Sequence, residues 1–213
     1  MTFIPTADVL AAYTAACFIL FITPGPDMSL FLAKTVTGGR RAGMAAMLGA
    51  FAGCLVHTML AALGLSALLA ASAAAFFALK VVGGFYLLWL AVDAVRHGSA
   101  LTIRDEARPE TSLRRIFLIG VGVNLTNPKV VLFFVTFLPQ FVSPDDPYAA
   151  RKLMFLGLYF TAVNLPLCAL LVVGADRVLA LLRRRPRVVR AIDYAFAGIF
   201  GAFAVKILST PGR

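Results

Sequence analysis

The stretch AGMAAMLGAFAGCLVHTMLAALGLSALLAASAAAFFAL, residues 42–79, contains no Asp, Glu, Lys or Arg. As a single α-helix rising about 1.5 Å per residue it would be about 57 Å long, roughly twice the ~30 Å hydrocarbon core of a bilayer. The run must therefore turn back on itself, and the small residues at 70–74 are the best place for a tight turn. This stretch predicts two membrane-spanning helices, Ala42–Leu69 and Ala73–Val95.

The composition of the whole chain indicates that lipid is its solvent. Apolar residues make up 61% of the 213 residues, charged residues 14%, and the mean hydropathy is +0.89. Soluble domains are roughly 45–50% apolar and about 25% charged. In a soluble protein the net charge of +10 would suggest nucleic-acid binding. Here the basic residues stand between apolar runs, so they predict orientation in a membrane, with lipid and no nucleic acid as the partner.

Four further apolar runs bring the predicted number of membrane-spanning helices to six: Val9–Ala33, Ile116–Val142, Leu153–Ala175 and Ala191–Leu208. Most of the 20 basic residues fall in alternate loops: Lys34, Arg40 and Arg41; Arg96, Arg104, Arg108, Arg114 and Arg115; Arg177, Arg183, Arg184, Arg185, Arg187 and Arg190. Because cytoplasmic loops carry excess Lys and Arg, these loops are predicted to be cytoplasmic and both termini to lie outside. The chain is then one transmembrane domain, with a first repeat at about 1–97, a cytoplasmic loop at about 98–113 and a second repeat at about 114–213.

No enzyme, metal or cofactor signature accompanies these helices. Cys17, Cys54 and Cys168 lie inside apolar runs without metal-ligand spacing, and we interpret them as small buried hydrophobic residues. The two histidines have no ligand spacing, and the chain contains no phosphate-binding loop motif. The sequence therefore predicts neither a catalytic centre nor a cofactor.

Two breaks that contain proline interrupt the first and fourth predicted helices. Pro24-Gly25-Pro26 precedes Asp27, and Asn127-Pro128 precedes Lys129. Proline removes a backbone donor and frees carbonyls that lipid cannot satisfy, so such a break persists where protein or water surrounds it. Each break opens a unit of three helices, and a three-helix unit enters the membrane in the opposite orientation to the one before it. This is typical of the inverted repeats of secondary transporters, although a kink packed against neighbouring helices is the alternative.

The two charges beside the breaks are costly at this depth. A charged group near the bilayer centre costs about 2.5–3.5 kcal/mol or more, so it usually faces the interior and has a partner. We expect Asp27 and Lys129 to approach one another or to line one cavity. There Asp27 could alternate between a proton and a cationic substrate, while Lys129 could neutralise it or attract a carboxylate. The alternatives are a helix cap for Asp27 and a structural ion pair or snorkelling for Lys129.

Other polar and small residues inside the predicted helices have two interpretations each. His57, Asn124, Asn127 and Asn164 could line a pathway, or could hydrogen-bond to neighbouring carbonyls. Pro166 predicts a further interruption of the fifth helix. The glycines of 49–53 could pack helices inside the molecule or form a homodimer. Phenylalanines near the breaks are expected to pack or face lipid, and Asp93 and Asp193 are expected to be charges at the membrane interface.

Motifs spread along the chain resemble the LysE/RhtB superfamily of bacterial amino-acid exporters. They are Ile22-Thr23-Pro24-Gly25-Pro26-Asp27, Gly53-Cys54-Leu55-Val56-His57-Thr58, Leu79-Lys80-Val81-Val82-Gly83-Gly84-Phe85-Tyr86-Leu87, Asn127-Pro128-Lys129, Phe133-Phe134 and Phe137-Leu138-Pro139-Gln140-Phe141. The resemblance implies efflux of amino acids such as threonine, homoserine, leucine or lysine across the bacterial inner membrane, coupled to proton entry. Its most specific motifs are those of the first and fourth helices. They contain the residues that the helix breaks predict to form a site, namely Pro24, Gly25, Pro26, Asp27, Asn127, Pro128 and Lys129.

A channel, or an accessory membrane subunit for another small solute, remains the competing interpretation. A channel can also build its pore from broken helices. Saturable flux coupled to a counter-ion would separate a transporter from a channel, and dependence on a second chain would indicate a subunit.

Overall fold

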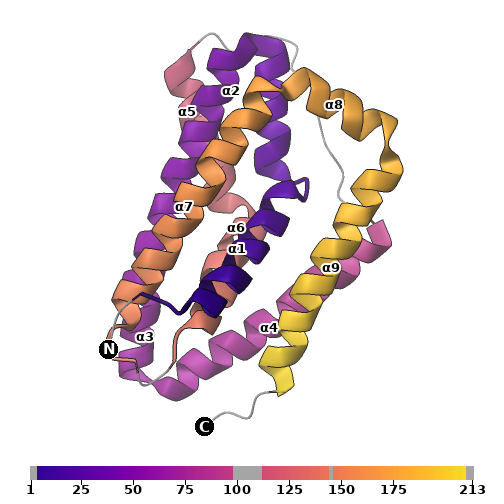
Figure 1. The fold of residues 1–213 in the computed structure, drawn as a ribbon. Helices are drawn as coiled ribbons and strands as arrows, with labels where there is room; N and C mark the ends of the chain where they lie inside the picture. The colour runs from indigo at the N-terminus through magenta and orange to yellow at the C-terminus, as the bar shows by residue number, and fades with distance from the viewer. Residues whose placement is uncertain (1–3, 98–111, 144–145, 210–213) are drawn as a thin grey trace.

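The computed structural model describes residues 4–97, 112–143 and 146–209, and the regular elements of this part are all helical (Figure 1). In chain order they are α1 (Ala7–Ile22), α2 (Pro26–Leu60), η1 (Ala61–Leu65), α3 (Ser66–Ala71), α4 (Ala73–His97), α5 (Leu113–Thr126), α6 (Pro128–Leu132), η2 (Phe133–Phe137), η3 (Leu138–Phe141), α7 (Ala149–Val173), α8 (Ala175–Arg184) and α9 (Pro186–Ser209). The expected polar loop at about 98–113 lies almost wholly outside the described residues.

Three helical stretches are long and apolar enough to cross a membrane: Pro26–Leu68, Phe77–Arg96 and Ala149–Val173. A fourth candidate is the pair Leu113–Thr126 and Pro128–Phe141, which is bent by 53° at its break. α1 is apolar but shorter. The prediction of an all-helical, multi-pass membrane protein is confirmed for the described residues, whereas the count of six spans stays a prediction.

The stretch Pro26–Leu68 does not run straight. Its 43 residues would extend about 65 Å as one helix, but Gly39 has φ 77° and ψ 176°, a left-handed conformation that glycine adopts without a Cβ clash. A Cβ on Gly43 would lie only 1.9 Å from Thr35 Oγ1, although eight residues of straight helix span about 12 Å. α2 therefore folds back at Gly39, as its two columns in Figure 1 show. The turn separates the predicted first and second spans.

A second turn lies at Ser72, within the predicted 70–74. Ser72 ends α3 with extended backbone angles (φ −160°, ψ 107°). Its Oγ then accepts a hydrogen bond from the Ala75 N–H at 3.1 Å, which satisfies one of the free donors at the start of α4. One serine thus terminates one helix and caps the next.

Glycines bring α2 and α5 into close contact. A Cβ on Gly49 would lie 2.0 Å from Phe117 O, and a Cβ on Gly120 would lie 2.2 Å from Ala46 O. Hydrogen at these positions lets the two backbones touch, which is how small residues promote helix packing in lipid. The glycines of 49–53 therefore pack inside the molecule, which is one of the two interpretations given above, and the homodimer stays a prediction.

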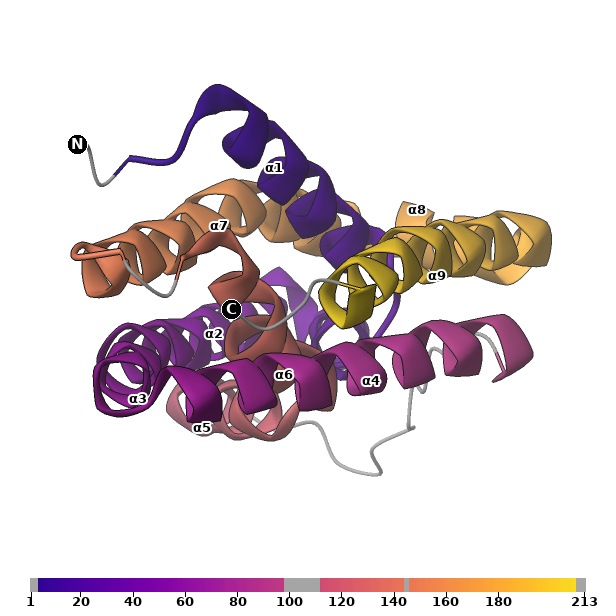
Figure 2. The ribbon, with the colours of Figure 1, turned by 90° about the horizontal axis from the view of Figure 1, so that it is seen from below.

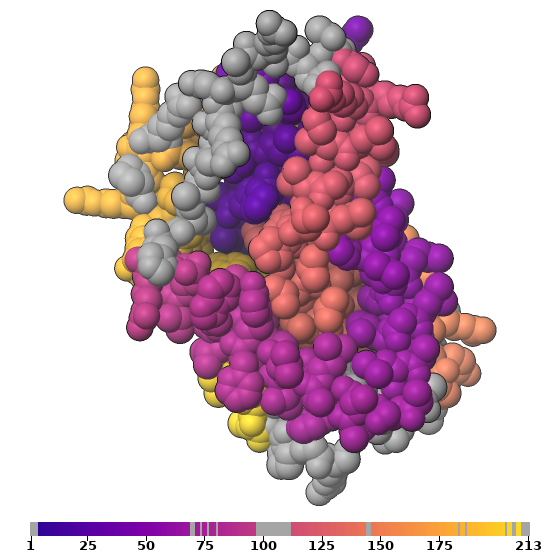
Figure 3. Space-filling view, turned by 180° about the vertical axis from the view of Figure 1, so that it is seen from behind, coloured from indigo at the N-terminus to yellow at the C-terminus, as the bar shows by residue number. Residues whose placement is uncertain are grey.

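The centre of the molecule is aromatic. Tyr13, Phe133, Phe134 and Phe137 are at most 1% exposed, and the rings of Phe133 and Phe137 lie 5.8 and 6.4 Å from that of Tyr13. Seen end on, α6 lies between α1 and α7 on one side and α2, α4 and α5 on the other (Figure 2). From behind, α5 and α6 fill the surface between α2 and α4 (Figure 3). Of the two expectations for phenylalanines near the breaks, packing or facing lipid, packing holds for these three.

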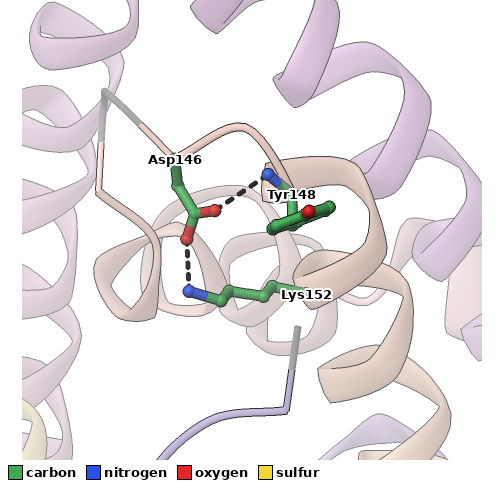
Figure 4. A network of polar contacts seen from close by, with 3 residues as sticks. All are labelled: Asp146, Tyr148 and Lys152. Carbon is green, nitrogen blue, oxygen red and sulfur yellow. Dashed lines mark hydrogen bonds and ion pairs between the residues drawn. The ribbon is translucent and has the colours of Figure 1, made fainter. Parts of the chain in front are cut away.

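A polar network fixes the start of α7 (Figure 4). Asp146 accepts hydrogen bonds from the backbone N–H of Tyr148, at 2.8 Å, and from the Lys152 ammonium. Burial opposes ionisation of this carboxyl, but the bonds from Lys152 and Tyr148 outweigh it and lower the pKa of Asp146 below its usual value. The helix that follows runs unbroken from Ala149 to Val173 with Pro166 inside it. The predicted interruption at Pro166 is therefore wrong, because α7 accommodates the loss of one backbone donor.

α8 was not predicted. Residues 176–190 were expected to form a basic loop, but Ala175–Arg184 is an amphipathic helix that crosses the end of the bundle between α7 and α9 (Figure 1). Leu179 is buried on its apolar face, while Arg177 and Arg184 are exposed. A helix with apolar and basic faces is suited to the boundary between headgroups and acyl chains.

Candidate functional site

The two helix breaks share one local construction. α1 ends at Ile22 and α2 starts at Pro26, while α5 ends at Thr126 and α6 starts at Pro128. Both prolines occupy the first helical position, where a backbone N–H has no intrahelical partner and its absence costs little. Asp27 and Lys129 consequently occupy the same position, the second residue of the helix that follows each break. At the second break Asn127 Oδ1 caps the new helix by accepting from Lys129 N at 3.1 Å.

Lys129 reaches across to the first break. Its Nζ donates hydrogen bonds of 2.6 Å to the carbonyls of Leu20 and Thr23. In an intact helix Leu20 O would accept from the backbone N of residue 24, which is a proline and has no hydrogen to give. The lysine therefore supplies the donor that Pro24 removes, and its positive charge suits the C-terminal end of α1. The ammonium also lies 5.9 Å from the ring centre of Phe196 on α9.

Asp27 is held from the second break. Its Oδ2 accepts a hydrogen bond of 2.7 Å from Asn124 Nδ2, in the last turn of α5. Its Oδ1 is buried and has no hydrogen-bond partner among the described residues. Asp27 and Lys129 line the same cavity and attract one another electrostatically. The hydrogen bonds described for the two side chains go to neutral groups.

His57 supports the second break from behind. Its Nε2 lies 3.4 Å from Asn124 O. In a continuous helix this carbonyl would accept from residue 128, which is a proline, and here it also accepts from the Asn127 N–H at 3.1 Å. The imidazole stacks against Phe134 with 5.5 Å between ring centres. This contact requires the tautomer that carries hydrogen on Nε2. His57 thus fits the interpretation of a donor to a neighbouring carbonyl.

A cavity of about 80 Å³ joins the two breaks. At about 10–15 Å³ for each water, it has room for several water molecules or one small polar group. Its lining includes most of the residues predicted from sequence: Gly25, Asp27, Asn124, Asn127, Lys129 and Asn164. Pro24, Pro26 and Pro128 shape the breaks and His57 lies behind Asn124, outside the lining.

Asn164 contributes a second free acceptor to this cavity. Its side chain is 3% exposed, its Nδ2 donates to Phe160 O at 2.9 Å, and its Oδ1 has no partner among the described residues. Phe160, Asn164, Cys168 and Leu171 all line the cavity and recur every three or four residues along α7, which places them on one helix face.

Other lining residues, and one buried charge nearby, were not predicted. Cys54 and Cys168 line the cavity rather than serving only as packing. Asp193 was expected at the membrane interface, but it is 1% exposed and attracts the Lys129 ammonium electrostatically. Its position near the start of the predicted sixth helix concealed this, because the actual helix α9 begins five residues earlier, at Pro186.

The arrangement is polar without being a metal centre or a catalytic constellation. Among the described residues, no group of three or more His, Cys, Asp or Glu side chains could hold a metal ion. The cavity lining includes the Asp27 carboxylate and the Asn164 amide, each with an oxygen that has no partner among the described residues. It also includes the Lys129 ammonium, which already donates to two backbone carbonyls. Such a site can bind a small donor-rich solute and can exchange a proton at Asp27.

Comparisons with known proteins agree with the motif resemblance. Residues 18–210 match the model of the LysE type translocator family. The chain is 30% identical over 189 residues to a homoserine/homoserine lactone efflux protein of Salmonella typhimurium, covering 89% of this chain and 90% of that one. It is 29% identical over 209 residues to an uncharacterized membrane protein of Pseudomonas aeruginosa, covering 95% and 97%. No solved structure matches the chain. The family model spans nearly the whole chain, including both helix breaks, so this protein belongs to the LysE type translocator family, whose members are transporters and not enzymes.

Proposed function

We propose that this protein is a secondary active exporter of amino acids or close derivatives, in the class of threonine, homoserine, leucine and lysine. The observation that carries the proposal is that both helix breaks line one small cavity, which also includes an acid with an unpartnered oxygen. The similarity to a homoserine/homoserine lactone efflux protein supports the choice of solute class. Irregular backbone at membrane depth is tolerated where it lines such a cavity, and transporters place their binding sites there.

Proton antiport follows from exchange at Asp27. A single carboxylate that binds either a proton or a cationic substrate cannot hold both, so release of one favours uptake of the other. Asn124 keeps the carboxylate in place through its 2.7 Å bond while leaving Oδ1 available. Lys129 binds the end of α1 and, in this mechanism, offsets the charge of Asp27 when the substrate has left.

We further propose six spans arranged as two inverted repeats, within the single domain expected from sequence (about 1–97 and about 114–213). The equivalent positions of Pro26 and Pro128 support this arrangement, as does the Gly39 turn, which allows α1 and the start of α2 to form one broken span. α1 starts and α9 ends toward the same end of the bundle (Figure 1). With the basic loops facing the cytoplasm of a bacterial inner membrane, both termini lie outside.

The test is flux in proteoliposomes under an imposed pH gradient, with labelled homoserine, threonine, leucine and lysine. We expect saturable, gradient-driven transport of at least one of them by the unaltered protein. Asp27→Asn should reduce the rate by about tenfold or more, because the amide cannot exchange a proton at neutral pH. Asp146→Asn is the matched control, since Asp146 lies at the start of α7, outside the cavity, and it should transport normally.

Each competing interpretation has its own signature in this assay. A channel gives flux that neither saturates nor responds to the pH gradient, while an accessory subunit gives no flux until a second chain is supplied. Normal coupled transport by Asp27→Asn would refute the role given to Asp27 while leaving the exporter assignment in place.

A further inference from the structure

The cavity lining contains two fully buried acceptor oxygens without a partner. Asp27 Oδ1 and Asn164 Oδ1 are both buried without a partner among the described residues, and both side chains line the same space of about 80 Å³. A buried polar atom without a partner is costly, at about 1–3 kcal/mol, and at a binding site such an atom indicates where a ligand donates. Two such oxygens on different helices, α2 and α7, make the indication specific.

The orientation of the Asn164 amide is fixed by chemistry. The oxygen and nitrogen of an asparagine side chain are often interchangeable, but Phe160 O is an acceptor and only the amide nitrogen can donate to it. Turning the amide over would set two oxygens against each other. The atom of Asn164 that lacks a partner is therefore its oxygen, on a side chain that lines the cavity.

The cationic side chain at the cavity is already engaged. Among the described lining residues Lys129 is the one Lys or Arg, and it donates at 2.6 Å to both Leu20 O and Thr23 O. Pulling it toward a substrate carboxylate would leave the end of α1 without the donor that Pro24 cannot supply. A carboxylate entering the cavity would also meet the oxygens of Asn164 and of ionised Asp27, which have no hydrogen to offer it.

From these contacts we infer that the cavity recognises a primary ammonium group, held between Asp27 Oδ1 and Asn164 Oδ1, and makes no specific contact with the carboxyl end of its cargo. This inference rests on the proposed function and specifies which chemical group of the transported molecule the protein recognises. A primary ammonium carries three N–H donors and one positive charge, so it can satisfy both oxygens and neutralise Asp27 together. Asn164 is then a specificity-determining residue, and amino-acid amides and esters are cargo while N-acylated amino acids are not.

The test is ligand binding to the purified protein, followed as the rise in its unfolding temperature on titration with probes. The probes are L-homoserine and L-leucine, each as the free amino acid, the amide, the N-acetyl acid and the N-acetyl amide. For at least one of the two skeletons, we expect the free amino acid and its amide to bind within about threefold of each other. Both N-acetyl forms should bind at least about tenfold more weakly, because an acetylated nitrogen has lost its charge and two of its hydrogens.

Variants locate the effect on Asn164. Asn164→Leu keeps the size of the side chain, removes the acceptor, and should weaken binding of the amide by about tenfold. Asn164→Asp retains an acceptor and should keep the preference for the ammonium forms, which covers the case in which the leucine variant fails to fold. Thr161→Val, on α7 but outside the cavity lining, should bind as the unaltered protein does.

The outcomes separate this inference from the proposed function. If an N-acetyl acid binds as tightly as its amino acid, if the amides do not bind, or if no probe binds, the inference is overturned, whatever the flux assay shows. If ammonium-dependent binding is found but no amino acid is transported under a pH gradient, the exporter assignment fails and the binding site stands.

Discussion

At the scale of single residues, proline chemistry and its compensation organise this protein. Pro24 removes the donor that Leu20 O would use, and Pro128 removes the donor that Asn124 O would use. Lys129 and His57, each from a different helix, bring a side-chain donor to these two carbonyls. Lys129 therefore also substitutes for the missing amide of Pro24, whereas His57 adds a second donor to a carbonyl that already accepts from the Asn127 N–H.

This compensation predicts the effect of removing the lysine ammonium. Lys129→Met keeps most of the apolar stem but leaves Leu20 O and Thr23 O without their 2.6 Å donors. We expect the free energy of unfolding to fall by about 2–3 kcal/mol, the cost of losing a charged donor to buried acceptors. The measurement is unfolding of the purified protein in detergent.

Lys152→Met provides the control for that experiment. It removes another lysine, which is partly exposed and paired with Asp146, and it should cost less than about 1 kcal/mol, as surface ion pairs do. Equal losses of unfolding free energy in the two variants would show that the bonds from Lys129 to the end of α1 stabilise the protein no more than a surface ion pair does.

Some residues of the site could be predicted from the sequence and others could not. Asp27, Asn124, Asn127, Lys129 and Asn164 were found because a charge or an amide inside an apolar run is costly unless it has a use. Their partners could not be predicted, because no spacing along the chain reveals that Lys129 bonds to α1 rather than to Asp27. Cys54 and Cys168 were not predicted to line the cavity for a different reason. A cysteine in an apolar run has the same sequence surroundings whether its side chain lines a cavity or packs in the core.

At the scale of elements, the contact between α2 and α5 depends on the absence of side chains. The two backbones lie so close that no Cβ fits at Gly49 of α2, against Phe117, or at Gly120 of α5, against Ala46. Association of helices in lipid relies on packing of this kind because the surrounding solvent is as apolar as the side chains. The arm of α2 after the Gly39 turn also packs on Asn124, because a Cβ on Gly53 would lie 2.6 Å from Asn124 Oδ1. The contact therefore helps to position the amide that donates the 2.7 Å hydrogen bond to Asp27, which lies on the other arm.

Two glycines of α5 provide a matched test of this contact. Gly120→Ala would place a Cβ 2.2 Å from Ala46 O, whereas a Cβ on Gly122 would meet nothing within 4 Å. We expect Gly120→Ala to lower the free energy of unfolding by about 1–3 kcal/mol through overpacking. Gly122→Ala should be neutral or slightly stabilising, because alanine favours the helix. The comparison is made by thermal unfolding, and a Gly120→Ala protein as stable as Gly122→Ala would contradict the packing argument.

At the scale of the whole molecule, hydropathy and charge alone predicted an all-helical membrane protein, because lipid leaves few alternatives for a chain this apolar. The turn at Ser72 was predictable from length, since the run 42–79 exceeds the bilayer. α8 was not predictable in the same way. The many arginines of this segment favoured a loop when they were counted along the chain. Its apolar face becomes visible only when the residues are arranged with the period of a helix.

The proposed topology predicts which turns can be reached from each side of the membrane. In a protein whose native cysteines are replaced by alanine, we introduce Thr37→Cys beside the Gly39 turn and Ser143→Cys before α7. Both side chains are exposed and uncharged, so the basic residues that orient the chain are kept. A membrane-impermeant maleimide should label Ser143→Cys in intact cells and Thr37→Cys only after the membrane is opened. Labelling of both from outside, or of Thr37→Cys alone, would overturn the six-span orientation.

The bond between Lys129 and the end of α1 has a consequence for how the protein is made. Lys129 lies 106 residues after Thr23, and a ribosome adding about 5–20 residues per second needs about 5–20 s to cover that distance. Throughout this interval the first break has no lysine to satisfy its carbonyls, and lipid cannot take its place. The nascent first half must wait in a polar environment, at the insertion machinery or near water, and it reaches its final structure only when the second half has been synthesised.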